Sequence, residues 1–108
     1  LAHAQSLVND GVLRGIGLTG MDTKRVREIV DSGVRVSTVQ GSFSVVDTRP
    51  RDGGMALMCQ EQGTVFVAHG ALCGGLLSER WLGAAEPEEQ GRRLPTSQLR
   101  KYYRWVTQ

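Results

Sequence analysis

Three short segments rich in β-branched and apolar residues, at 13–18, 34–39 and 64–68, alternate with single helical patterns along this chain. Strands separated by one helix of about ten residues pair in parallel, because an antiparallel hairpin needs only a short turn. Such βαβ units have right-handed crossovers. The alternation therefore predicts an α/β fold with a parallel sheet and not an antiparallel meander.

The first two helical patterns have recognisable boundaries. Residues 2–9 predict the end of a helix that stops at Asp10-Gly11, because glycine readily adopts the left-handed conformation that follows many helices. Either Asp22 or Thr23 caps the next helix. Apolar residues of that helix recur at i, i+3, i+4 and i+7, and these predict its buried face: Val26, Ile29, Val30 and Gly33.

Turn and loop signals divide the rest of the chain. The turn cluster 49–54 opens a helix at 55–62, which ends at Gly63. After the third strand, residues 83–96 form a polar loop that holds two of the three prolines, and a loop of this length is usually functional or mobile. A final helix at 97–107 has an apolar face made by Leu99, Tyr103 and Val106.

The segment 67–79 is the most informative single stretch. An apolar strand leads there into a loop of glycine and alanine, which is followed by a short helical turn. Backbone N–H groups of such a loop approach an anion closely, and the start of a helix adds unsatisfied donors. Taken alone, the pattern fits a phosphate site and a tight strand-to-helix turn equally well.

Charge and cysteine content exclude several classes of protein. The net charge is +2, from 13 basic and 11 acidic residues that are interspersed along the chain. This charge distribution does not by itself indicate nucleic acid or an anionic membrane as a partner. No apolar run is typical of a signal peptide or a membrane span. The two cysteines, Cys59 and Cys73, do not make a disulfide framework. We therefore expect a reducing, cytoplasmic setting.

Three segments, 14–22, 36–47 and 67–79, resemble the fifth, sixth and seventh strands of the aldo/keto reductase barrel in order and spacing. The resemblance covers nearly the whole chain. It implies a partial (β/α)₈ TIM barrel, with about three parallel βα units and a C-terminal helix. A complete barrel needs about 250 residues, so residues 1–108 are expected to form a single segment of less than half a barrel. Because the chain begins at Leu1, we expect an excised segment, an incomplete gene model or a remnant reading frame.

The same resemblance implies contacts to a nicotinamide cofactor, NADP(H), at the strand ends. Thr19 and Gly20 stand where the family has a Ser or Thr and an Asn that bind the carboxamide, and Gly20 loses its contact. Gln40 matches the second residue of the family's Asn-Gln pair and retains an amide for the carboxamide. His69 replaces the tyrosine that stacks on the nicotinamide ring. The loop that offers its backbone to the pyrophosphate consists of Gly70, Ala71, Leu72, Cys73 and Gly74.

Simpler interpretations of these residues stay open. Thr19 can satisfy the backbone at a strand end, and Gln40 can be an ordinary exposed glutamine. A metal role for His69 is not expected, because His3 is the only other histidine and no Cys/His spacing suits zinc. Cys73 next to an anion site is a candidate for a reactive thiol, although the family's Leu-Cys-Gly-Gly version of the loop explains it more simply.

The catalytic groups of the family are a tyrosine acid with a lysine, an aspartate and a histidine, and all come from earlier strands. We therefore assign no catalytic residue, and we expect Tyr102 and Tyr103 of the final helix to pack or to face solvent. General acid catalysis contributes roughly 10² to 10⁴ in rate, so this chain alone is expected to be inactive. The resemblance implies a segment of an NADP(H)-dependent reductase of aldehydes, ketones or sugars, which supplies the nicotinamide and pyrophosphate contacts.

An alternative is a non-catalytic remnant that acts as a structural or protein-interaction subunit. Three parallel strands cut from a barrel leave two unpaired edges and an uncovered face, which another chain would cover. The departures at Gly20 and His69 favour this alternative mildly. The basic and aromatic residues of the final helix also fit nucleic-acid binding. An ordinary amphipathic helix is favoured over that, because the family has a similar Ser-x-x-Arg-Lys-Tyr stretch.

Overall fold

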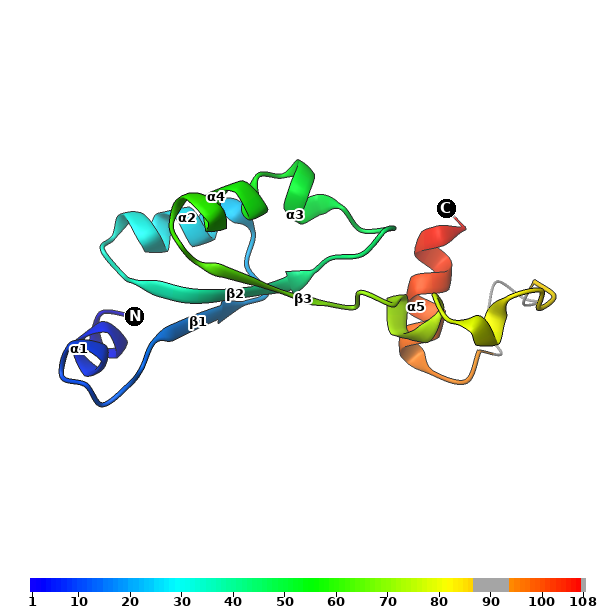
Figure 1. The fold of residues 1–108 in the computed structure, drawn as a ribbon, viewed down its shortest axis with the longest axis horizontal. Coiled ribbons are helices and arrows are strands. Elements are labelled where there is room, and N and C mark those ends of the chain that lie inside the picture. Colours follow the sequence, from blue (N-terminus) through cyan, green and yellow to red (C-terminus); the bar gives the residue numbers. More distant parts are fainter. Residues whose placement is uncertain (87–93, 108) are drawn as a thin grey trace.

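The computed structural model describes residues 1–86 and 94–107 of the chain. Helices and strands alternate along it, which confirms the predicted α/β class (Figure 1). Two one-turn 3₁₀ segments, η1 (Cys73–Gly75) and η2 (Glu79–Trp81), lie between the last strand and the last helix. The other elements are α1 (Ala2–Asn9), β1 (Ile16–Thr19), α2 (Thr23–Asp31), β2 (Val36–Ser42), α3 (Arg49–Asp52), α4 (Met55–Glu61), β3 (Val65–His69) and α5 (Ser97–Val106).

The three strands form one parallel sheet in the order β1-β2-β3, as the helical connections predict. The register aligns Leu18 with Val39 and Val39 with Phe66, so these side chains share one face of the sheet. Successive residues of a strand alternate between faces, and the next residues in register, Thr19 and Gln40, therefore share the opposite face.

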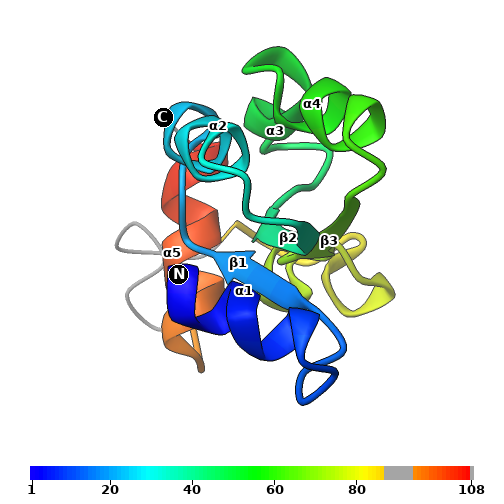
Figure 2. The ribbon, with the colours of Figure 1, turned by 90° about the vertical axis from the view of Figure 1, so that its left-hand side faces the viewer.

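Helices α2, α3 and α4 lie over the first of these faces (Figures 1 and 2). The main hydrophobic core fills the layer between them and the sheet, where Val26 of α2 and Val39 of β2 are each only 1% exposed. Asp22 caps α2, because its carboxylate accepts a hydrogen bond of 2.8 Å from the Arg25 N–H. The buried members of this core are Ile16, Leu18, Val26, Ile29, Val34, Val36, Val39, Met55, Met58 and Cys59.

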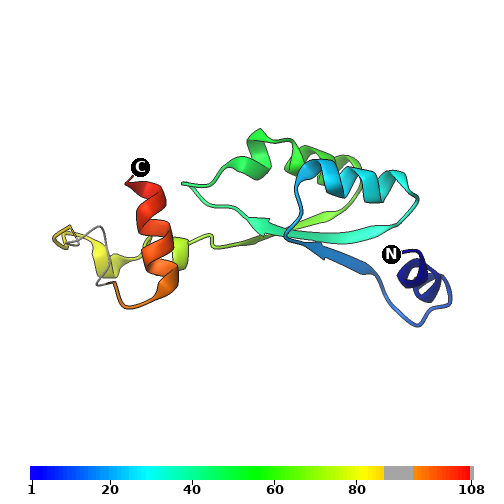
Figure 3. The same ribbon diagram turned by 180° about the vertical axis from the view of Figure 1, so that it is seen from behind.

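The opposite face of β2 and β3 carries no helix among the residues that the structure describes (Figure 3). Val65 and Val67 point to this side and are 60% and 39% exposed. Parallel sheets are normally covered on both faces, so this exposure is unusual for a self-contained α/β domain. A partial barrel has this property, because the same face of the sheet lines the interior of a complete barrel.

Helix α5 belongs to a second, smaller cluster beyond the end of the sheet (Figure 1). Leu94, Leu99 and Tyr103 are buried there against Leu76 and Trp81. The two clusters follow one another along an elongated molecule of 56 × 27 × 21 Å. Its radius of gyration is 17.8 Å, whereas a compact domain of this length has about 13 Å, so much of the chain's surface is not packed against itself.

The strand boundaries differ from those predicted. β1 begins at Ile16 and not at residue 13, because the N–H groups of Val12 and Leu13 donate to the Leu7 carbonyl, at 2.9 and 3.1 Å, at the end of α1. β2 continues to Ser42 and not only to residue 39, because β3 pairs with it as far as the Ser42–His69 step.

Helix boundaries were predicted more accurately. Helix α1 and the end of α4 before Gly63 follow the prediction closely, and of the two predicted caps of α2 the structure has Asp22. Gly33 is wrong as a member of the buried helix face, since α2 ends at Asp31. The turn cluster 49–54 contains the one-turn helix α3. In residues 1–86 and 94–107, no helix combines the length and hydropathy that a membrane span requires.

Candidate functional site

The carboxyl ends of the three strands bring together residues that are far apart in the sequence. Thr19 ends β1 and lies in register with Gln40, and its hydroxyl donates a long hydrogen bond of 3.4 Å to the Gln40 amide oxygen. His69 ends β3 opposite Ser42. Beyond that step, the Phe43 N–H donates to the His69 carbonyl at 3.1 Å and so fixes the backbone of the histidine.

A pocket of about 480 Å³ opens at these strand ends, within the range of small-molecule sites. Its lining comes from both sides of the sheet and from the loops that follow β1 and β2. The lining residues are Gly20, Met21, Asp22, Thr23, Val39, Gln40, Gly41, Ser42, Arg49, Pro50, Gly53, Met55, Phe66 and His69. Three of the predicted cofactor residues, Gly20, Gln40 and His69, therefore meet in one cavity, and Thr19 reaches it through Gln40.

Ser42 lines this cavity and carries a buried polar atom that is unsatisfied. Its hydroxyl oxygen is buried and has no hydrogen-bond partner among the described residues. The hydroxyl is near enough to Asp47 to help lower the pKa of that carboxyl, without the geometry of a regular hydrogen bond. A buried polar group without a hydrogen-bond partner costs free energy, so this oxygen lowers the stability of the fold locally.

One side of the pocket is built around an ion pair between Asp47 and Arg49. The Arg49 Nε and Nη2 groups donate to the two carboxylate oxygens of Asp47, at 2.7 and 2.8 Å. The Asp47 side chain is 1% exposed and that of Arg49 is 72% exposed. The hydrogen bond from Arg49 is the largest cause that lowers the pKa of Asp47 to about 2, and burial of the carboxyl opposes it. Asp47 is thus a fixed negative charge that orients the arginine.

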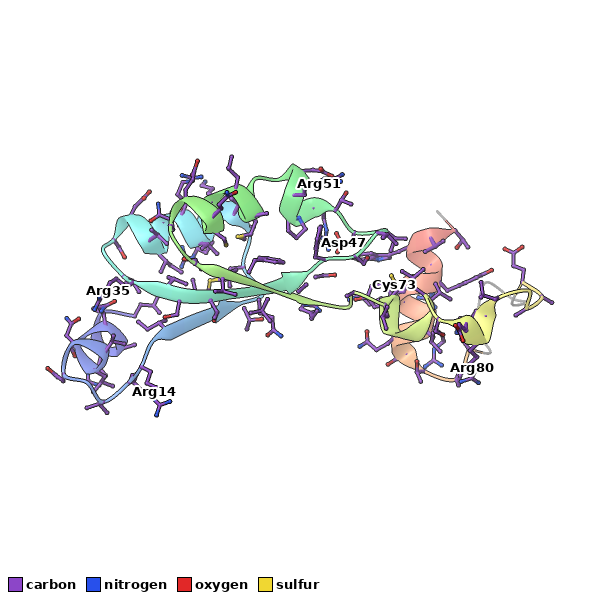
Figure 4. All side chains as sticks on the ribbon, viewed as in Figure 1. Arg14, Arg35, Asp47, Arg51, Cys73 and Arg80 are labelled. Atoms are coloured by element: carbon purple, nitrogen blue, oxygen red, sulfur yellow. The ribbon has the colours of Figure 1, made fainter. Side chains whose placement is uncertain are left out.

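A tight turn holds this aspartate in place. Ser44 and Asp47 exchange backbone hydrogen bonds, and the Ser44 hydroxyl accepts from the N–H groups of Val46 and Asp47 at 3.2 and 3.1 Å. The thiol of Cys73 donates to the same hydroxyl at 3.5 Å. Figure 4 shows Asp47 and Cys73 at the junction between the sheet and α5. The turn therefore links the two halves of the molecule.

The loop from Gly70 to Gly74 lies outside the pocket lining, under helix α5. A Cβ atom on Gly70 would occupy the position of the Tyr102 hydroxyl, and one on Gly74 would lie 2.8 Å from Gln98 Cβ. The three-residue η1 begins within this loop at Cys73, so the predicted helical turn with free N–H donors is a single 3₁₀ turn. Within the loop, Ala71 and Leu72 remain exposed, and Leu72 is 62% exposed.

Both cysteines are buried and free, and they lie in different surroundings. Cys59 is packed in α4, and burial raises the pKa of its thiol. Cys73 is 0% exposed, so the structure does not present it as a reactive thiol at the surface. Its φ angle is 52°, a left-handed conformation that is uncommon for any residue except glycine.

The sequence comparison identifies the family. A model of the aldo/keto reductase family matches residues 1–107. The chain belongs to the aldo/keto reductase family. It is also similar to flagellar radial spoke protein 5 of Chlamydomonas reinhardtii, with 35% identity over 77 residues. That match covers 70% of this chain and 14% of the radial spoke protein, so the chain spans about one seventh of that relative's length.

Membership of the aldo/keto reductase family explains the position of the pocket. In a (β/α)₈ barrel, ligands bind at the carboxyl ends of the parallel strands, which is where the pocket lies. The family typically uses a nicotinamide cofactor. Sequence reasoning did not find the Asp47–Arg49 pair as part of the site, although the Asp-x-Arg-Pro stretch in the loop after β2 was the available signal.

Proposed function

We propose that residues 1–108 form the strand 5 to strand 7 segment of an NADP(H)-dependent aldo/keto reductase and contact the cofactor. The observation that carries this proposal is the pocket at the strand ends, in which Gln40 and His69 face the same cavity. These two positions correspond to cofactor-contacting residues of the family. The third strand end adds Thr19, which is hydrogen-bonded to Gln40.

The donors and acceptors of the pocket fit a nicotinamide carboxamide. The Gln40 oxygen accepts from Thr19, and the amide NH₂ group is left to donate to the carboxamide oxygen. The imidazole of His69 supplies a flat surface for the ring, in place of the family's tyrosine. Gly20 lines the pocket with backbone only.

The loop of Gly70, Ala71, Leu72, Cys73 and Gly74 is the proposed contact to the pyrophosphate. Gly70 lies under the Tyr102 side chain of α5, whereas Ala71, Leu72 and Gly74 are exposed. The accessible backbone of the loop is therefore at these three residues. A pyrophosphate that reached Gly70 would require α5 to move.

NADP(H), when bound, would supply the hydride for reduction of an aldehyde, ketone or sugar carbonyl. The residues of this chain would bind and orient the nicotinamide, and none of them is proposed as the proton donor. A general acid must stand at the carbonyl oxygen, and we assign that role to the part of the barrel formed by earlier strands. By this proposal the chain alone binds cofactor without turning over substrate.

A titration of the chain with NADPH, followed by nicotinamide fluorescence, tests the proposal. We expect saturable binding that tightens in His69→Tyr, because a phenol ring stacks over a larger area than imidazole. Gln40→Ala should weaken binding roughly tenfold through loss of the amide contacts. Gln60→Ala, on the exposed side of α4, is the matched control and should leave binding unchanged. Absence of binding in a chain that circular dichroism shows to be folded would reject the proposal.

A second candidate function is that of a non-catalytic subunit of a protein assembly. The similarity to a radial spoke protein and the uncovered sheet face with Val65 and Val67 favour it. A partner chain that covers this face would complete the burial that a parallel sheet normally has. Hydrogen exchange separates the candidates: NADPH should protect amides around Gln40 and His69, whereas a subunit without a cofactor role shows no protection there.

A further inference from the structure

Helix α5 has an exposed stripe with a high density of positive charge. Residues 97, 101, 104 and 105 recur at i, i+4, i+7 and i+8 and therefore lie on one side of the helix. Lys101, Arg104 and Trp105 of this stripe are exposed, whereas Leu99, Tyr102 and Tyr103 are buried on the other side. The helix, Ser97–Val106, contains no acidic residue. The charge of the stripe is not balanced within its own element.

A distant part of the chain adds a third cation to this stripe. The loop after β2 reaches the C-terminal half of α5 (Figure 1), and the Arg49 guanidinium carbon lies 5.0 Å from the centre of the Trp105 ring. The Lys101 ammonium lies 5.4 Å from the centre of the same ring. One indole is thus approached by two cations from separate elements. We call the surface formed by Arg49, Lys101, Arg104 and Trp105 the Trp105 face.

The Trp105 face carries an excess of positive charge. Only Arg49 is neutralised, by Asp47, and among the described residues neither Lys101 nor Arg104 forms an ion pair. The indole remains 39% exposed, and Val106 beside it is 51% exposed. An exposed tryptophan surrounded by cations has the composition of a binding hot spot, in which an aromatic anchor is flanked by arginine.

We propose that the Trp105 face binds an acidic protein segment, with carboxylates on Lys101 and Arg104 and an apolar side chain on Trp105. Charge complementarity favours a carboxylate-rich partner. A nucleic acid fits less well, because single-stranded binding uses several stacking platforms along a charged groove, and this face offers one indole. The proposal does not depend on cofactor binding, since the residues to be tested do not line the pocket.

Fluorescence anisotropy with labelled probes tests the proposal on the complete chain. The probes are a short peptide of Glu-Glu-Leu repeats, a Lys-Lys-Leu peptide of equal length, and oligothymidylate of equal length. We expect the acidic peptide to bind more tightly than either of the others, and the affinity to fall as salt is raised. Tighter binding of oligothymidylate would overturn the choice of a protein partner, and equal binding of all three probes would overturn the proposal.

Two double variants distinguish specific binding at the Trp105 face from a general effect of the chain's net charge. Lys101→Glu with Arg104→Glu reverses two charges at i, i+3 on the Trp105 face, and we expect it to weaken binding of the acidic peptide at least tenfold. Lys24→Glu with Arg27→Glu makes the same change at the same spacing on the exposed side of α2 and should alter the affinity less than twofold. Equal losses in the two variants would refute the Trp105 face.

Trp105→Ala provides an independent test that changes no charge. The proposal requires this variant to weaken binding of the acidic peptide roughly tenfold or more, as truncation of a hot-spot tryptophan does. Circular dichroism of each variant checks that the helix content is retained. An unchanged affinity of folded Trp105→Ala would show that the indole is not an anchor and would overturn the proposed mode of binding.

Discussion

The ion pair between Asp47 and Arg49 makes the stability of this chain depend on pH in a defined direction. Arg49 lowers the pKa of Asp47 from its ordinary value of 3.8 to about 2 in the folded chain. A pKa difference of one between the folded and unfolded states corresponds to about 1.4 kcal/mol, so this lowering stabilises the folded state by at most about 2.5 kcal/mol. The Arg49 side chain is 72% exposed, so solvent screens the pair and we expect about 1 to 2 kcal/mol.

The sign of the effect follows from the protonation of each state. A carboxyl whose pKa is lower in the folded state stabilises that state wherever it is ionised in both states, which is above the unfolded pKa of 3.8. As the pH falls from about 4 to about 2, the unfolded chain takes up the proton first, and the stabilisation is lost. At neutral pH the contribution is complete.

Urea unfolding of the wild type and of Asp47→Asn, followed by circular dichroism from neutral to acidic pH, measures this contribution. We expect the variant to be less stable by about 1 to 2 kcal/mol at neutral pH, and the difference to disappear only as the pH falls below about 2, the folded pKa of Asp47. Asp52→Asn is the control, because Asp52 pairs with Arg51 at 2.8 Å and both are exposed. A difference between wild type and Asp47→Asn that stays constant over the whole pH range would refute the reasoning.

Four substitutions test backbone conformation, core packing and helix capping by the same unfolding measurement. Gly70→Ala and Gly33→Ala both place a Cβ at positive φ, which strains the backbone by about 1 to 2 kcal/mol. Only at Gly70 does the Tyr102 hydroxyl also occupy the position of the new Cβ, so Gly70→Ala should lower the free energy of unfolding more. Equal decreases in the two variants would contradict that contact. Val39→Ala should lower the free energy of unfolding by about 2 kcal/mol, since Val39 is 1% exposed, and a loss near zero would argue against a packed core there. Asp22→Ala should cost about 1 kcal/mol, and unchanged stability would show that the cap of α2 is not needed.

Local sequence signals predicted the elements of this fold well, and their ends less well. A capping aspartate and helix-ending glycines act through bonds within a few residues, so Asp22 and Gly63 could be interpreted without knowing the rest of the fold. Strand ends depend on pairing with distant segments. β2 extends to Ser42 only because β3 continues beside it to His69, and no local feature of residues 40–42 signals that extension.

The candidate site could be predicted only in part for the same reason. Gln40 and His69 were identified through family resemblance, and the sheet register brings both to one pocket. The role of Arg49 at the pocket and on Trp105 results from packing of α5 against a loop more than 50 residues earlier in the chain. The cover of α5 over Gly70 was likewise not predicted, since Tyr102 lies 32 residues after Gly70 in the chain and no local feature of either segment signals the contact.

The uncovered face of the sheet becomes more polar toward the carboxyl ends of the strands. The register places Thr38 beside Val65 in one layer, Gln40 beside Val67 in the next, and Ser42 beside His69 in the last. Water exposure of an isolated sheet gives no reason for valines on this face or for polar side chains gathered at the strand ends. The interior of a barrel has both reasons, because apolar side chains fill its centre and its sites lie at the strand ends. The gradient therefore connects the exposed Val65 and Val67 with the pocket as two consequences of one barrel-lining surface.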